Sequence, residues 1–169
     1  MNKALTSPIS RSAIALGKMS AISLIAALQA SLIIGIALAI GVTFPNPLMI
    51  IPIMGIVILF SLGFSGISVT LAATAKSQET FWGMINLLGM PLFMLSPALF
   101  PLELLPNWLA VVAKLNPVTY TVLLVRELMT GGSAGGVPIL ISIAVIFAFV
   151  VAMVAIASYV FTREVNKPF

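Results

Sequence analysis

The distribution of charged residues constrains this fold more than any other feature of the chain. No charged residue lies between Lys18 and Lys76, and two more uncharged stretches run from Glu79 to Glu103 and from Glu127 to Arg163. A helix that crosses a bilayer needs about 20 mostly apolar residues, so the first stretch can hold two crossings and each later stretch one. The chain is 61% hydrophobic and 7% charged, too little charge for the surface of a water-soluble fold. We therefore predict an all-α, multi-pass membrane protein.

Prolines and polar clusters divide the apolar sequence into four predicted spans. Two prolines within residues 44–47 end the first span, and the polar residues 74–80 follow the second. We predict one transmembrane domain over residues 1–169, with a short helical connector at residues 101–136 and spans at residues 19–43, 48–73, 81–100 and 137–161.

The positive charges beside the spans predict their orientation. With four spans both termini lie on the same side, and six of the eight basic residues are then on that side: Lys3, Arg11, Lys18, Lys76, Arg163 and Lys167. Lys114 and Arg126 face the other way. Basic residues favour the cytoplasmic side of a membrane. We therefore expect a protein of the cell membrane with both termini in the cytoplasm. The scattered charges form no basic run, which argues against nucleic acid as a partner despite the net charge of +4.

Missing residue types exclude most catalytic and metal sites. The chain has no Cys, no His and no Asp, which removes disulfides, thiol chemistry, most zinc sites and Ser-His-Asp catalysis. We expect no catalytic residue, no metal and no cofactor on this chain.

The connector is too apolar for an ordinary external loop. Pro106 and Pro117 are placed as first-turn prolines of two short helices, Asn116 as an N-cap, and Gly131 with Gly132 as a C-terminal stop. The connector either rests as an amphipathic loop on the outer membrane surface or forms a re-entrant pair of helices. Trp108 and Tyr120 suit the headgroup level in either arrangement, and the resemblance given below favours the re-entrant one.

Two sequence patterns resemble the ABC-2 type transporter permeases, and within them the branch of daunorubicin-resistance and nodulation exporters. The longer pattern spans about 40 residues and comprises Asn86, Pro91, Ser96, Phe100, Pro101, Leu105, Pro106, Trp108, Asn116, Pro117, Tyr120 and Arg126. The shorter pattern comprises Pro8, Ile9, Ser10 and Arg11, followed by Gly17 and Lys18.

The resemblance implies a subunit of a larger machine. Such permeases usually have six spans, and this chain is similar to the last four, so either it is a fragment or a partner chain supplies the rest. The resemblance also implies a second permease subunit, forming a homodimer or heterodimer, and separate ATP-binding-cassette subunits that carry the ATP and Mg²⁺. The chain has no GxxxxGK[ST] motif of its own. We therefore expect a non-enzymatic exporter subunit; the alternative is a small carrier or assembly factor that is not coupled to ATP.

The resemblance also suggests roles for particular residues. Residues 6–15 are similar to the helix that couples the membrane domain to the ATPase, with Arg11 best placed for contact; the alternative is a simple positive anchor. Residues 101–128 are similar to the outer re-entrant segment that covers the translocation path. Gln29, Asn86 and Ser96 either face that path or contribute to helix packing, and for Gln29 and Asn86 we favour hydrogen bonds to a neighbouring helix.

Helix packing is also predicted from small residues spaced four apart. The pairs are Gly35 with Ala39, Ala37 with Gly41, and Ser61 with Ser65.

Overall fold

The computed structural model describes residues 11–99, 102–132 and 136–165, and in these residues the chain is helical with no β-strand. The α-helices are α1 (Arg11–Ala39), α2 (Ile50–Thr74), α3 (Gln78–Met94), α4 (Asn107–Leu115), α5 (Pro117–Thr130) and α6 (Ile139–Val165). Two 3-10 turns, η2 (Pro47–Met49) and η3 (Leu102–Leu104), precede α2 and α4. The predicted all-α class is confirmed.

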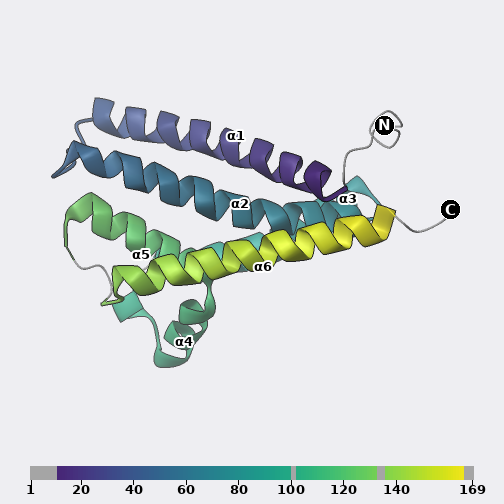
Figure 1. Ribbon diagram of the computed structural model, residues 1–169. Coiled ribbons are helices and arrows are strands. Elements are labelled where there is room, and N and C mark those ends of the chain that lie inside the picture. The colour runs from purple at the N-terminus through teal and green to yellow at the C-terminus, as the bar shows by residue number, and fades with distance from the viewer. Residues whose placement is uncertain (1–10, 100–101, 133–135, 166–169) are drawn as a thin grey trace.

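Three helices are long and apolar enough to cross a bilayer, and they match the first, second and fourth predicted spans. They are α1, α2 with its preceding turn, and α6. The start of α1, the end of α6 and the turn between α2 and α3 lie together at one end of the bundle, which we call the terminal end (Figure 1). The connection between α1 and α2 lies at the opposite end, the loop end, together with the last turn of α5 (Figure 1).

The third predicted span, residues 81–100, corresponds to a shorter helix that is shifted toward the N-terminus. α3 begins early because the Ser77 side chain caps it, accepting a hydrogen bond of 3.1 Å from the Thr80 backbone N–H. It ends at Met94 because Pro97 has no N–H to continue the helix and disfavours a helical conformation at Ser96. At 17 residues, α3 lies at the lower limit for a crossing.

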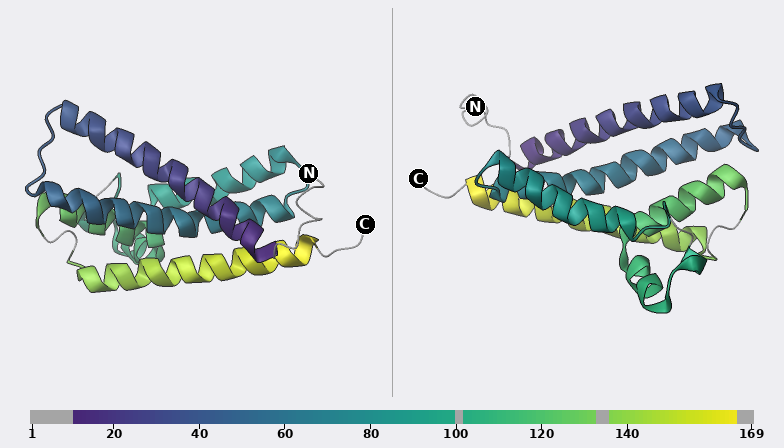
Figure 2. Two further views of the ribbon diagram at one scale, coloured as in Figure 1. Left: turned by 45° about the horizontal axis from the view of Figure 1, so that its top comes forward. Right: turned by 180° about the vertical axis from the view of Figure 1, so that it is seen from behind.

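The connector contains the two predicted short helices, and they meet at a sharp bend. α4 and α5 are separated by Asn116 and are bent by 90° relative to each other. Their combined length and composition would suit one broken span or a re-entrant loop. α4 projects away from the long helices, whereas α5 lies along them (Figures 1 and 2).

The core of the bundle is built around α2, which packs against both α1 and α6. Two glycines allow α6 to come close. A Cβ atom on Gly66 would lie 2.9 Å from the backbone oxygen of Met153, and one on Gly63 would lie 2.9 Å from the Phe149 ring. Helices in membranes associate through close packing at small residues of this kind, so these two positions fix the α2–α6 contact.

Buried apolar residues form two clusters at different heights in the bundle. Near the terminal end, Ala15 and Met19 of α1 pack with Val69 of α2 and Ala157 of α6. Farther toward the loop end, Leu124 of α5 packs with Ile146 and Val150 of α6. The second cluster joins α5 to the long helices and gives it a defined place in the bundle.

Candidate functional site

The first turn of α5 lies beside the middle of α2. Val118 shares a small cavity with Phe60 and Phe64 of α2. These phenylalanines lie about 15–21 Å along the helix from the start of α2, at 1.5 Å per residue. From this depth α5 runs to the loop end, where Gly131 lines another small cavity with Asn46. α5 therefore extends from the middle of α2 to the loop end of the bundle.

Asn116 connects the end of α3 to the start of α5. Its side-chain oxygen accepts a hydrogen bond of 3.0 Å from the Val118 backbone N–H, which caps α5 as predicted. Its side-chain N–H donates to the backbone carbonyl of Leu92 in the last turn of α3. The last four carbonyls of a helix have no partner within the helix, so one buried side chain stabilises two helix ends at once.

Arg126 makes a second connection to the same region. Its guanidinium donates a hydrogen bond of 2.9 Å to the backbone carbonyl of Pro97, which lies just beyond α3 and is fully buried. Charge-assisted hydrogen bonds are stronger than neutral ones. Arg126 and Asn116 are almost three helical turns apart on α5, so two separated points hold α5 against the segment that follows α3.

Two hydroxyl groups stabilise the bend between α4 and α5. Thr119 donates a hydrogen bond of 2.6 Å to the Ala113 carbonyl, and Tyr120 donates one of 2.7 Å to the Lys114 carbonyl. The last turn of a helix has free carbonyls that such donors can satisfy. Tyr120 therefore contributes to the bend itself.

Gly131 ends α5 as predicted, with φ +68° in the left-handed region. Pro106 was predicted in the first turn of α4, but it lies one residue earlier, directly before the helix. Its backbone carbonyl accepts a hydrogen bond from the Ala110 backbone N–H. Leu105 is half-buried beside it. Phe100 and Pro101 lie outside the described residues.

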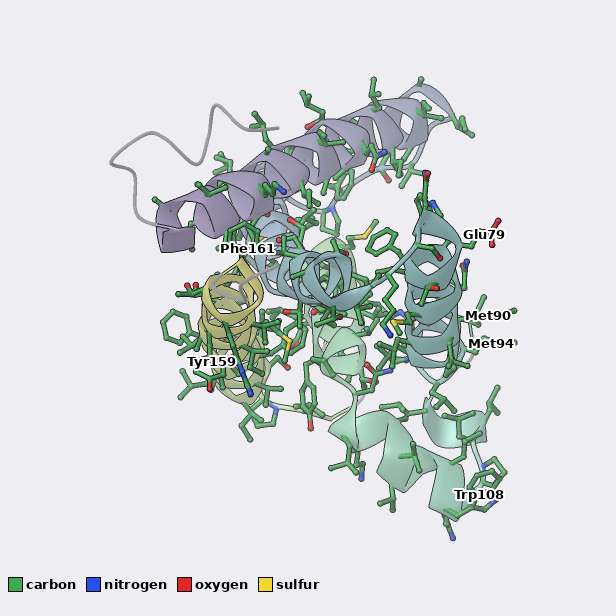
Figure 3. All side chains as sticks on the ribbon, turned by 90° about the vertical axis from the view of Figure 1, so that its right-hand side faces the viewer. Glu79, Met90, Met94, Trp108, Tyr159 and Phe161 are labelled. Carbon is green, nitrogen blue, oxygen red and sulfur yellow. The ribbon has the colours of Figure 1, made fainter. Side chains whose placement is uncertain are left out.

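Trp108 is exposed on the outer surface of α4 and points away from the bundle (Figure 3). Leu104 and Leu115 are also exposed, at 75% and 81%. Such apolar surface on a helical segment that projects from the bundle is typical of a segment that contacts lipid. α4 therefore presents apolar surface to lipid, and the bent pair of α4 and α5 has the length and composition of a broken span or a re-entrant loop.

The predicted ATPase-coupling segment is described only in its second half. Pro8, Ile9 and Ser10 lie outside the described residues, as does the side chain of Arg11. From Arg11 onward the backbone is one continuous helix through Gly17 and Lys18 into the first span. In the described residues, the segment is thus the first part of α1 and has no break before Lys18.

The polar residues within the predicted spans lie in different environments. Gln29 is exposed on α1, and Asn86 is exposed on α3, where its side chain donates to the Trp82 carbonyl of the same helix at 2.9 Å. For Asn86 this differs from the hydrogen bond to a neighbouring helix that we favoured. Ser96 is buried and donates to the Phe93 carbonyl at 2.7 Å, which helps to end α3.

The predicted small-residue contacts are found at only one of the three pairs. Ser65 is buried and donates to the Leu62 carbonyl at 2.7 Å, with the Met19 carbonyl of α1 also within 3.5 Å. A Cβ atom added to Gly35 would meet nothing within 4 Å. Sequence reasoning missed Gly63 and Gly66, which are spaced three apart and are the only two described glycines with such close neighbours.

Within the part of the chain that the structure describes, no fully buried side-chain nitrogen or oxygen atom lacks a hydrogen-bond partner, and no group of acidic residues suits a metal ion. Two of these side chains, Asn116 and Arg126, connect α5 to the last turn of α3 and the segment after it.

Comparison with known proteins gives a family for this arrangement. The family model described as ABC-2 type transporter matches residues 1–130. A protein named as an inferred transport permease, ycf38, of Cyanophora paradoxa is 29% identical over 134 residues, which cover 79% of this chain and 46% of that protein. The protein of the same name from Pyropia yezoensis is 30% identical over 125 residues, which cover 72% of this chain and 42% of that protein.

The chain thus spans less than half the length of the relatives that it matches. No solved structure matches it. The family match covers α1 to α5 and includes both connections of α5 to the α3 region. The chain belongs to the ABC-2 type transporter family.

Proposed function

We propose that this chain is a membrane-spanning subunit of an ATP-binding-cassette exporter, that it forms part of the translocation path, and that it couples to a separate ATPase subunit. The observation that carries the proposal is the family match over residues 1–130. The re-entrant helix α5 and its fixed position beside the middle of α2 are consistent with a segment that covers one side of a path.

In this proposal the two ends of the bundle have different tasks. The terminal end faces the cytoplasm and contacts the ATPase through residues 6–15. The loop end faces outward, and α5 covers the path from that side. ATP and Mg²⁺ bind to the partner ATPase, and a second permease subunit completes the path. The direction of transport is outward, as in the exporters that the connector sequence resembles.

Arg11 provides the sharpest test of coupling. The chain is co-expressed with each ATP-binding-cassette ATPase of its own genome, and the complex is purified through a tag on the permease. We expect one ATPase to be retained and Arg11→Glu to reduce its retention at least tenfold, because breaking a partly desolvated interfacial charge pair costs about 2–5 kcal/mol. Lys3→Glu is the control, since it makes the same change in charge outside the proposed helix.

Two results would contradict the proposal at different levels. If no ATPase is retained by the unmodified chain above the level of an unrelated membrane protein, the exporter function is wrong. If an ATPase is retained equally by Arg11→Glu and Lys3→Glu, the exporter function stands and the coupling role of Arg11 is wrong.

A further inference from the structure

A cavity at the terminal end lies where four helices come together. It has a volume of about 480 Å³, within the range of about 300–1,000 Å³ that is typical of small-molecule sites. Its wall contains Lys18 and Ala21 of α1, Ser68 and Ala72 of α2, Phe81 of α3 and Phe161 of α6. The wall is apolar except for Lys18 and Ser68, so the cavity suits a ligand with a hydrocarbon part.

Lys18 places one positive charge at the edge of this apolar cavity. Its side chain is exposed, and its ammonium group lies 5.6 Å from the centre of the Phe161 ring. Phe161 lies between the ends of α6 and α1 in the view along the bundle (Figure 3). The ring holds the cation by a cation–π contact and leaves the other side of the ammonium group available to an anion.

The depth of Lys18 matches the phosphate level of a bilayer. α1 rises 1.5 Å per residue, so Lys18 lies about 32 Å along the helix from Ala39 at the loop end. The hydrocarbon core of a bilayer is about 30 Å thick. If Ala39 marks one edge of that core, Lys18 lies at the other edge, where lipid phosphates are found, and the apolar cavity wall extends inward from it.

The surroundings of the cavity favour an anion. Among the side chains described at the terminal end, Lys18, Lys76 and Arg163 are exposed cations. Glu79 is also exposed there, and it points away from the bundle on the far side of α3 (Figure 3). None of the residues lining the cavity is acidic. Basic residues near a membrane surface attract anionic lipids.

We infer that this cavity binds one anionic phospholipid, with the headgroup phosphate on Lys18 and part of an acyl chain against Ala21, Ala72 and Phe81. The site is separate from the re-entrant helix. The inference goes beyond the proposed export function and does not depend on an ATPase, because it concerns this chain and its bilayer alone.

Native mass spectrometry of the full chain, released from nanodiscs that contain equal amounts of phosphatidylglycerol and phosphatidylcholine, tests the inference. We expect one phosphatidylglycerol to be retained in preference to phosphatidylcholine. Lys18→Gln should reduce this preference about fivefold, the effect of one basic residue near the surface. The matched control is Lys76→Gln, which removes an exposed charge at the same end of the bundle but outside the cavity wall, and it should leave the preference nearly unchanged.

A second pair of variants tests the hydrocarbon part of the site. Ala72→Phe should fill the cavity and reduce the retention of both lipids, whereas Ala152→Phe adds the same ring at an exposed position on α6 outside the cavity and should not. Equal effects of Lys18→Gln and Lys76→Gln would mean that charge attracts lipid without a site, and would overturn the inference. Unchanged lipid retention in Ala72→Phe would also overturn the inference. This includes the case in which the variant changes only the oligomeric state, because another helix then fills the cavity.

Discussion

The side chain of Asn116 donates a hydrogen bond to the backbone carbonyl of Leu92, a residue that precedes it by 24 positions, while its oxygen caps the helix that follows. Asn46 offers a natural comparison. It too precedes a proline, and its side-chain oxygen accepts from the backbone N–H two residues on, again at 3.0 Å. Asn46 is exposed and Asn116 is buried, so the two residues share the local cap and differ in the distant connection.

Asn116→Ala should destabilise the folded chain by about 2–4 kcal/mol, because the cap contributes about 1 kcal/mol and a buried carbonyl left without a partner costs about 1–3 kcal/mol. Asn46→Ala should lose only the cap, about 1 kcal/mol. The measurement is the free energy of unfolding in mixed micelles, followed by circular dichroism. Equal losses in the two variants would show that the Leu92 contact contributes nothing to stability.

Arg126→Gln should loosen the contact between α5 and the segment after α3. The variant replaces a charge-assisted hydrogen bond to the Pro97 carbonyl, which typically contributes about 1.5–3 kcal/mol. We expect faster hydrogen exchange in α5, measured by mass spectrometry, with little change in α1. Lys114→Gln is the control, because it removes an exposed charge from α4. Unchanged exchange in α5 would contradict the role of Arg126 as a connection.

Gly66→Ala should separate α2 from α6 and destabilise the bundle by about 1–3 kcal/mol, the usual cost of overpacking. The cost should be larger than for Gly63→Ala, because the Met153 backbone near Gly66 cannot move aside as the Phe149 ring near Gly63 can. Gly55→Ala is the control, since its new methyl group meets nothing within 4 Å and alanine favours a helix by up to about 1 kcal/mol. The free energy of unfolding in mixed micelles should be lowest for Gly66→Ala. Equal free energies for all three variants would contradict the close packing of α2 and α6.

The orientation of the chain can be tested with single cysteines, because the chain has none of its own. A cysteine at Lys76 should be protected from an impermeant maleimide in intact cells, and one at Gly132 should be labelled. Both residues are exposed and lie at opposite ends of the bundle. Labelling both after permeabilisation controls for reactivity. The reverse pattern would place the termini outside.

Local features of the fold were predictable from sequence, whereas contacts between distant helices were not. The Asn116 cap and the Gly131 stop follow from residue types at neighbouring positions, and the structure contains both. The early end of α3 was missed although Pro97 signals it, because the uncharged stretch continued to Glu103 and length was given more weight. The second hydrogen bond of Asn116, to Leu92, depends on how α5 returns to α3, which no local pattern determines.

The double role of Asn116 has a consequence for the order in which the protein is assembled. α3 leaves the ribosome before α5 and reaches the bilayer with the Leu92 carbonyl still lacking a partner from within its helix. α5 has only 14 residues and its first turn is capped by the same asparagine, so one side chain completes both the end of α3 and the start of α5. The emerging chain therefore carries, at the end of α3, a free carbonyl whose partner is supplied only when Asn116 has been synthesised.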